Sequence, residues 1–232
     1  MACYRGRQGR SWPVAPGPLL NSGMRIREPV NGASHLVGLL LASAGTVLLL
    51  RMASGPWQVA SFAVYGTTLI LLYGASTLYH LLPLSDRPLR ALRTLDHIAI
   101  YFLIAGTYTP IALITLHSPL GWALLATVWL IAVAGIPFKL FFLDAPVWIS
   151  TATYLAMGYL ALLAVVPLAR AVSIGGLLWL IAGGLAYTIG AVIYSRQRPD
   201  PFPGRFGHHE IWHLLVLTGS ACHFAFMVFH VA

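Results

Sequence analysis

The sequence predicts an all-α membrane protein, a seven-transmembrane helix bundle with no separate soluble domain. Of its 232 residues, 58% are hydrophobic and only 9% are charged, a balance far too apolar for a soluble domain. Its apolar runs reach the roughly 20 residues that a helix needs to cross a bilayer. Its Lys and Arg residues fall unequally on the two sides that these runs would define. This asymmetry is typical of multi-pass proteins of the cell membrane, which in a bacterium is the inner membrane.

Residues 1–27 precede the first apolar run and carry five Arg and three Pro. They lack the continuous apolar stretch of a signal peptide. We expect a disordered cytoplasmic tail here and a transmembrane domain over residues 28–232. Met24 stands just before the first recognisable element, which is compatible with a native start there and with residues 1–23 being an extension.

Apolar runs bounded by Pro, Gly or charged residues predict seven spans. They cover approximately residues 32–51, 57–80, 92–115, 119–137, 146–167, 172–194 and 209–231. The fourth and fifth spans are the least clearly separated, because Pro137, Lys139, Asp144 and Pro146 crowd the connection between them. We place Lys139 in this connection, which fits either a loop or an interfacial segment.

The distribution of positive charge predicts the orientation of the bundle. With the N-terminus inside, the outer connections hold only Arg51 and Arg170. The inner segments hold the other twelve Lys and Arg residues, which are Arg5, Arg7, Arg10, Arg25, Arg27, Arg87, Arg90, Arg93, Lys139, Arg196, Arg198 and Arg205. The positive-inside rule therefore predicts a cytoplasmic N-terminus and a C-terminus outside. It also explains the net charge of +8 without nucleic acid as a partner.

Polar residues gather at the predicted inner ends of four spans. Ionisable groups inside hydrocarbon are costly and are functional candidates by default. The gathered residues are Glu28, Asn31, His35, Ser76, His80, Asp96, His97, His208, His209, Glu210 and His213. Three pairs are four residues apart and so share a helix face: Asn31 with His35, Ser76 with His80, and His209 with His213.

These residues are suited to a metal ion. The only cysteines are Cys3 and Cys222, so a Cys-based zinc motif is not available. The pair His209 and His213 can grip one cation, and His80 from another helix would supply a third nitrogen. Three protein ligands with a fourth position left for water are the arrangement of catalytic zinc. Asp96, in the first turn of its predicted span, is the candidate general base.

Five motifs carry a resemblance to a known family. They are Glu28-Pro-Val-Asn-Gly-Ala-Ser-His35, Ser76-Thr-Leu-Tyr-His80, Leu95-Asp-His-Ile98, Ala105-Gly-Thr-Tyr-Thr-Pro110 and His209-Glu-Ile-Trp-His213. With these motifs the chain resembles the haemolysin III family, within the progestin and adiponectin receptor family of seven-helix membrane proteins. The resemblance runs from about Glu28 to His230 and covers nearly everything beyond the tail.

The resemblance implies a seven-helix bundle with the N-terminus inside and a zinc ion held by His80, His209 and His213. The family's aspartate near the zinc water corresponds to Asp96, and its motif serine to Ser76. Receptor members are thought to have ceramidase-like lipid amidase activity, whereas bacterial members carry the haemolysin name. The resemblance therefore defines the architecture better than the activity.

The segment from His209 to His213 also fits H-E-x-x-H, in which Glu210 would be the base of a zinc metalloprotease. On an ideal helix Glu210 lies about 100° around from His209, and the surrounding motifs favour the other family. A triad of Ser76, His80 and Asp96 lacks the G-x-S-x-G elbow of such hydrolases. We retain Glu210 only as a residue that supports the metal ligands.

Other residues keep two interpretations. The Ser76 hydroxyl either bonds its own helix backbone or holds the zinc water. His35 is either a partner tied to Glu28 and Asn31 or part of a polar cluster at a helix start. The remaining histidines and three glycines are assigned to packing: His97, His117, His208, His223, His230, Gly183, Gly184 and Gly190.

The preferred function is a zinc-dependent hydrolase of a membrane lipid, with an amide as the scissile bond. Zinc is the expected cofactor and membrane lipid the expected partner. A structural zinc ion fits the same residues. The alternatives are a haemolysin or pore-associated cytolytic protein and a seven-helix receptor. Short predicted outer connections would give a protein ligand little to contact.

Overall fold

The computed structural model describes residues 19–20 and 24–232. In this part of the chain, seven helical segments are long and apolar enough to cross a membrane. They are α1 (Pro29–Met52), α2 (Pro56–Leu81), α3 (Asp86–Pro110) with the π-helix η1 (Ile111–Leu116), α4 (Pro119–Phe141), α5 (Val147–Tyr159) with the 3₁₀-helix η2 (Leu160–Ala164) and α6 (Val165–Ala171), α7 (Ile174–Arg196) and α8 (His208–His230). The predicted seven-helix architecture of a multi-pass membrane protein is confirmed.

Local sequence explains where several helices begin. Pro29, Pro56 and Pro119 occupy the first position of α1, α2 and α4, where the missing N–H costs nothing. Ser118 and Ser173 cap α4 and α7, because their hydroxyls accept hydrogen bonds from the backbone N–H of the third residue along. Such caps satisfy donors that the first turn of a helix leaves unpaired.

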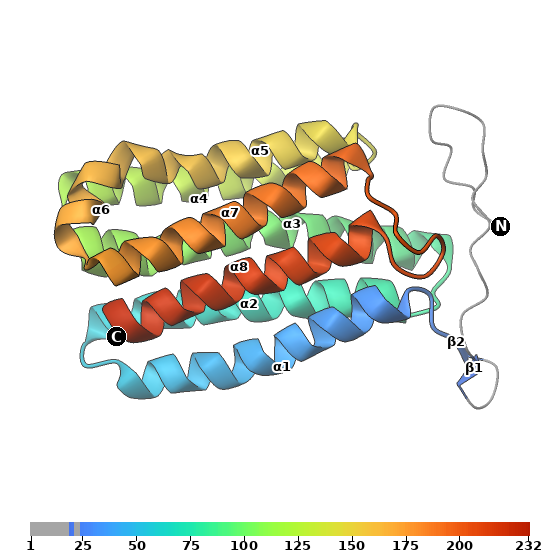
Figure 1. Ribbon diagram of the computed structural model, residues 1–232, viewed down its shortest axis with the longest axis horizontal. Helices are drawn as coiled ribbons and strands as arrows, with labels where there is room; N and C mark the ends of the chain where they lie inside the picture. The colour runs from blue at the N-terminus through green and yellow to red at the C-terminus, as the bar shows by residue number, and fades with distance from the viewer. Residues whose placement is uncertain (1–18, 21–23) are drawn as a thin grey trace.

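Contacts link α1, α2, α3, α5, α7 and α8 into a ring, and Figure 1 shows the bundle from the side. Neighbours along the chain pack from α1 to α4, α7 packs on α8, and α1 closes the ring against α8. Helix α5 packs on both α3 and α7. One end of the bundle holds the starts of α1, α3 and α8 and the end of α2. We call it the histidine end because His80, His209 and His213 lie there.

The outward faces of the helices are apolar, as a surface in contact with lipid requires. Leu41, Leu130 and Phe141 are well over half exposed, which suits side chains that meet hydrocarbon. Inside the ring, Gly106 of α3 lies against Thr68 of α2. A Cβ at this glycine would collide with the Thr68 side chain, so a small residue is needed for the two helices to approach closely.

The predicted packing role of three glycines in α7 is partly confirmed. Gly183 lies against His223, and Gly190 lies against Trp212, both on α8. Gly184 has no atom within 4 Å of the position that a Cβ would take. It lines an internal cavity instead.

The connection between the fourth and fifth spans differs from the prediction. Helix α4 continues past Pro137 to Phe141, so Lys139 is a helical residue and not part of a loop. Its side chain is 0% exposed. Placing Lys139 in the connection was wrong, because a proline and a cation suggested a break that the helix does not have. The connection itself is a loop over residues 142–146 rather than an interfacial helix.

Most of the predicted tail, residues 1–27, lies outside the described residues. Within the part that is described, β1 (Leu19–Leu20) pairs antiparallel with β2 (Met24–Arg25).

Candidate metal centre

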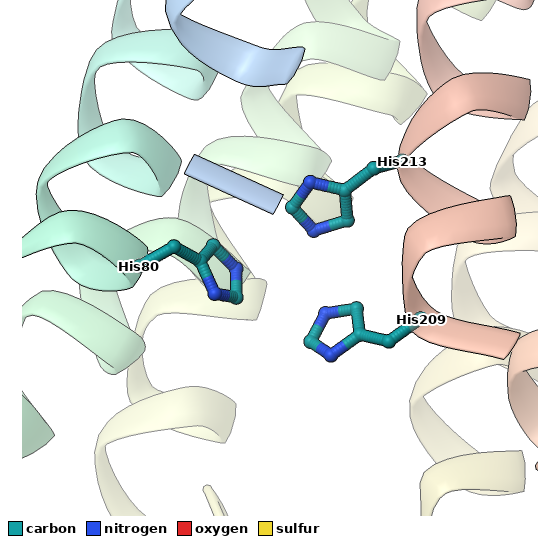
Figure 2. A group of neighbouring side chains, drawn as sticks. All are labelled: His80, His209 and His213. Carbon is teal, nitrogen blue, oxygen red and sulfur yellow. The ribbon is translucent and has the colours of Figure 1, made fainter. Parts of the chain in front are cut away.

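Three histidines from two helices meet at the histidine end. His80 is the second-last residue of α2, and His209 and His213 lie four residues apart in the first turns of α8. The ring centroids are separated by 5.0 Å for His80 and His209, 4.7 Å for His80 and His213, and 4.9 Å for His209 and His213. Figure 2 shows the three rings directed toward one space between the helices.

One nitrogen from each of the three rings lies within 4.8 Å of the others. His80 and His213 are buried, and His209 is partly buried. Nitrogen ligands about 2.0–2.1 Å from a tetrahedral zinc ion are less than 4 Å apart. A small closure of the rings would therefore allow all three to ligate one ion.

Glu28 fixes the His80 ring. Its Oε2 atom lies 2.6 Å from His80 Nδ1, and its backbone N–H donates to the His80 carbonyl at 3.1 Å. Because a carboxylate only accepts, Nδ1 carries a proton, and in a neutral imidazole this arrangement leaves the lone pair on Nε2. His80 Nε2 is buried and has no hydrogen-bond partner among the described residues. An unpaired buried acceptor facing two other imidazoles fits a metal ligand.

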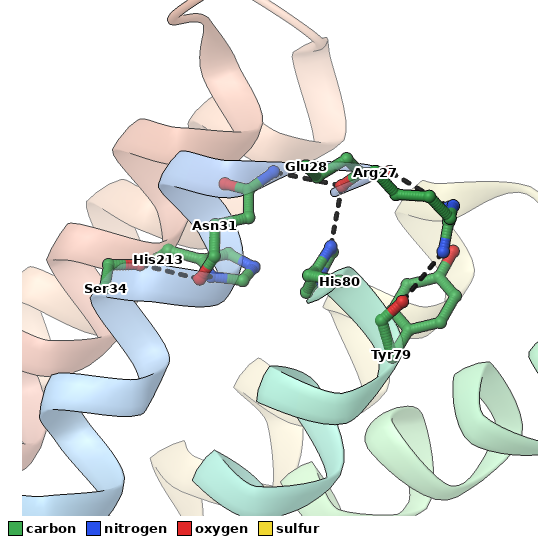
Figure 3. A network of polar contacts seen from close by, with 7 residues as sticks. All are labelled: Arg27, Glu28, Asn31, Ser34, Tyr79, His80 and His213. Carbon is green, nitrogen blue, oxygen red and sulfur yellow. Dashed lines mark hydrogen bonds and ion pairs between the residues drawn. The ribbon is translucent and has the colours of Figure 1, made fainter. Parts of the chain in front are cut away.

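The Glu28 carboxylate is held from three sides (Figure 3). Asn31 Nδ2 donates to Oε2 at 3.1 Å, and Arg27 Nη2 donates to Oε1 at 3.1 Å. Arg27 also donates to the Tyr79 carbonyl at 2.7 Å. Burial raises the pKa of Glu28, but interactions that include the hydrogen bonds from His80 and Asn31 outweigh it and lower the pKa to about 2. The carboxylate therefore stays ionised.

The His213 ring is oriented by a backbone carbonyl. His213 Nδ1 lies 3.3 Å from the Asn31 carbonyl oxygen, so this nitrogen is the donor and Nε2 is left for a metal. Ser34 Oγ donates to the same carbonyl at 2.9 Å. The start of α1 thus orients ligands on both α2 and α8, although it supplies no ligand of its own.

One interpretation of the sequence tied His35 to Glu28 and Asn31. In the described part of the chain, His35 forms no hydrogen bond with either residue. Its ring stacks on His213, with centroids 3.8 Å apart, and meets the edge of Tyr73 at 5.0 Å. Both ring nitrogens are buried without a hydrogen-bond partner in the described part of the chain. His35 therefore supports the His213 ring by packing.

Glu210 points to its own helix start. Its Oε2 atom accepts a hydrogen bond from the Gly207 backbone N–H at 2.8 Å. This is the reciprocal bond of a helix N-terminus, which satisfies an otherwise unpaired donor. The arrangement argues against Glu210 as the base of an H-E-x-x-H protease.

Asp96 and Ser76 lie beside the histidines in one cavity. Asp96 is 9% exposed and Ser76 1% exposed, and the Ser76 side chain lies next to the Asp96 carboxyl. Both line a cavity of about 530 Å³ together with His209 and His213. A carboxyl group and a hydroxyl group thus line the same space as two of the three histidines.

This cavity continues along the bundle. Beyond the polar residues its walls are mainly apolar, and they reach Leu116, Leu124 and Leu168 near the opposite ends of their helices. His97 and His223, which the sequence assigned to packing, also line it. The spacing of Arg93, Asp96 and His97 by three and four residues places them on one face of α3, and this signal could have revealed His97. The cavity can hold a long apolar chain with its polar end near the histidines.

The comparisons with known proteins agree with this architecture. The family described as "Haemolysin-III related" matches residues 24–224. Hemolysin-3 of Bacillus cereus is 41% identical over 207 residues, which cover 88% of this chain and 91% of that protein. The Hemolysin-3 homolog of Bacillus subtilis is 40% identical over 209 residues, which cover 88% and 95%.

A more distant relative is the monocyte to macrophage differentiation factor of Homo sapiens. It is 29% identical over 218 residues, which cover 87% of this chain and 88% of that protein. No solved structure matches the chain significantly. The extent of these matches and the seven apolar helices lead to one assignment: the chain belongs to the haemolysin III family.

Proposed function

We propose that the protein is a zinc-dependent hydrolase of a lipid amide in the cell membrane. The observation that carries this proposal is that Asp96, Ser76, His209 and His213 line the polar end of one long apolar cavity, and that His80 converges on the same two histidines. A soluble substrate would gain nothing from such a cavity. A lipid can place its acyl chain among the apolar walls and its amide beside the histidines.

His80, His209 and His213 would hold the ion. A donor set of three neutral imidazoles suits zinc, and the hydrogen bonds at Nδ1 of His80 and His213 leave Nε2 of each ring to ligate. With an open fourth position, a zinc ion held there would make a bound water molecule more acidic and would polarise a carbonyl group. Glu28 strengthens His80 as a ligand, because a hydrogen-bonded carboxylate makes the imidazole more basic.

Asp96 is assigned as the general base. Its carboxylate takes a proton from the attacking water and delivers it to the amide nitrogen as the carbon–nitrogen bond breaks. The products are a fatty acid and an amine. Ser76, next to that carboxyl, holds the water by a hydrogen bond. Burial of these groups excludes bulk water, which strengthens their electrostatic effect on the reaction.

The test combines metal content with turnover. We expect about one zinc ion per purified chain, loss of zinc in His80→Ala and His209→Ala, and retained zinc in His223→Ala. His223 is a matched control because it lies on α8 and lines the same cavity away from the three ligands. The protein should release fatty acid from a library of lipid amides. If protein that contains zinc releases no fatty acid from these lipids, the zinc ion is structural and the proposed hydrolase is wrong.

A cytolytic function is the second candidate, because the Bacillus cereus relative carries the name Hemolysin-3. Dye release from liposomes separates the two. A pore should survive the combined change of His209 and His213 to Ala if the bundle still folds. Lysis that follows from altered lipids should disappear with zinc.

A receptor function finds less support. The connections opposite the histidine end are short, covering residues 53–55, 117–118 and 172–173. They offer a protein ligand little surface to contact, as the sequence predicted.

A further inference from the structure

Lys139 is a buried cation that the proposed mechanism does not use. Its Nζ atom donates a hydrogen bond to Ser150 Oγ of α5 and lies 5.3 Å and 5.6 Å from the ring centroids of Phe138 and Tyr154. No carboxylate pairs with it among the described residues. An ammonium group without a counter-ion inside a membrane span is costly, which makes it a functional candidate.

Asp144, the acidic residue in the loop after α4, already pairs with two arginines. Asp144 accepts hydrogen bonds from Arg90 at 2.7 Å and from Arg93 at 2.9 Å. The Arg90 hydrogen bond lowers the pKa of Asp144, so the carboxylate is ionised and shared by two guanidinium groups. Arg90, Arg93 and Lys139 thus carry three positive charges against the two carboxylates of Asp144 and the neighbouring Asp96, which leaves one positive charge over.

This positive charge borders the cavity of the metal centre. Arg93 and His97 of α3 and Ser150 of α5 line the cavity, and Lys139 of α4 reaches this wall through its hydrogen bond to Ser150. Because Ser150 Oγ accepts from Lys139, its own O–H is free to donate into the cavity. The Lys139 ammonium has two further N–H donors. The wall formed by α3 and α5 is therefore rich in donors and positive charge.

The metal centre occupies the other side of the same cavity. Ser76 of α2 and the histidines of α8 form that wall, and Asp96 lies on α3 between the two sides. Asp96 is three residues from Arg93, which is slightly less than one helical turn and about 4.5 Å of rise. A ligand at the metal centre can thus reach the positive wall with a group only a few atoms away from its reacting bond.

Building on the proposed function, we propose that this positive wall binds a phosphate group, and that the substrate is a lipid amide whose head group carries phosphate. Phosphate oxygens accept several hydrogen bonds at once, and Arg and Lys are the side chains that bind them best. A neutral head group would leave the Lys139 charge uncompensated. A lipid phosphate is favoured over free phosphate because the rest of the cavity wall is mainly apolar.

Binding tests the proposal without turnover. The full-length protein with His209→Ala, which should not hydrolyse amides, is placed in nanodiscs of uncharged lipid. Two lipid amides with the same acyl chain are compared, one with a phosphate monoester head group and one with a hydroxyl. We expect the phosphate lipid to bind at least about tenfold more tightly, in line with charge-assisted hydrogen bonds. Adding Lys139→Met should remove this preference.

Arg196→Met is the matched control. Arg196 is an exposed residue in the last turn of α7 at the same end of the bundle, so its loss removes one positive charge without touching the cavity wall. The head-group preference should survive this change. If Lys139→Met fails to fold, Ser150→Ala provides a second variant, for which we expect a loss of about threefold.

Equal binding of the two lipids by protein with Lys139 intact would overturn the proposal, as would a preference that persists in folded Lys139→Met. Inorganic phosphate is tested alone. Tight binding of this ion with no preference between the lipids would assign the wall to free phosphate and overturn the lipid assignment. A head-group preference in a protein that contains no zinc and releases no fatty acid would refute the proposed hydrolase while leaving the phosphate site in place.

Discussion

Glu28 Oε2 lies 2.6 Å from His80 Nδ1, so a residue just before α1 fixes a candidate metal ligand at the end of α2. The two residues are separated by 52 positions in sequence. Because of this contact, we expect metal binding to depend on the position of the start of α1 as well as on the three candidate ligands.

The first prediction follows from this contact. Glu28→Gln removes the negative charge that makes His80 a stronger ligand, while keeping an oxygen that can accept the Nδ1 proton. We expect zinc affinity to fall by about 10- to 100-fold, the usual effect of losing such a partner. Competition with a chelator of known affinity measures it.

Glu210→Gln is the control for this prediction. It is also a change of Glu to Gln at the histidine end, but its side chain bonds only the start of its own helix among the contacts described. It should leave zinc affinity within about twofold of the wild type. Equal losses in both variants would mean that Glu28 acts on the fold and not on His80.

The second prediction separates Asp96 from the metal ligands. Asp96→Asn removes the base but keeps the size of the side chain. We expect turnover of a lipid amide to fall by about 10²- to 10⁴-fold, the range for loss of general acid–base catalysis, while zinc content stays unchanged. Measuring both quantities on one preparation is essential. A zinc-free Asp96→Asn protein would instead place this carboxylate among the ligands.

The third prediction concerns the length of the cavity. A Cβ at Gly184 would meet no atom within 4 Å, and this residue lines the cavity, so Gly184→Leu should fill space without breaking a contact. We expect the released fatty acids to shift toward shorter chains. Mass spectrometry of the products from mixed-length amides gives the profile.

Ala182→Leu is the matched variant for Gly184→Leu. Ala182 is exposed on the same helix and does not line the cavity. Its product profile should match the wild type. Identical profiles for all three proteins would show that the acyl chain lies elsewhere.

The fourth prediction tests orientation, which rests on charge alone. In a background without Cys3 and Cys222, Ser54→Cys and Ser85→Cys place single thiols in exposed connections at opposite ends of the bundle. We expect an impermeant thiol reagent to label Ser54→Cys in intact cells and Ser85→Cys only after the membrane is opened. The reverse pattern would place the histidine end outside.

The sequence predicted the seven spans because each is a long apolar run with a clear boundary. It also predicted that His80 would lie near His209 and His213, since alternating spans return these helix ends to the same side. Lys139 was misplaced, because a local pattern of proline and charge cannot reveal that a helix carries a cation into its packed interior. The hydrogen bond between Glu28 and His80 could not be predicted from the sequence either, since contacts between residues 52 positions apart depend on tertiary packing.

Helix α8 separates the C-terminus from the histidine end of the bundle. His208 starts this helix at the histidine end, and His230 ends it on the far side of the bundle (Figure 1). Its 23 residues span about 35 Å at 1.5 Å per residue. An affinity tag or fluorescent reporter joined to the C-terminus is therefore held far from the histidines. A fusion joined close to Arg27 would instead disturb the residues that hold Glu28, so metal measurements are best made on protein tagged at the C-terminus.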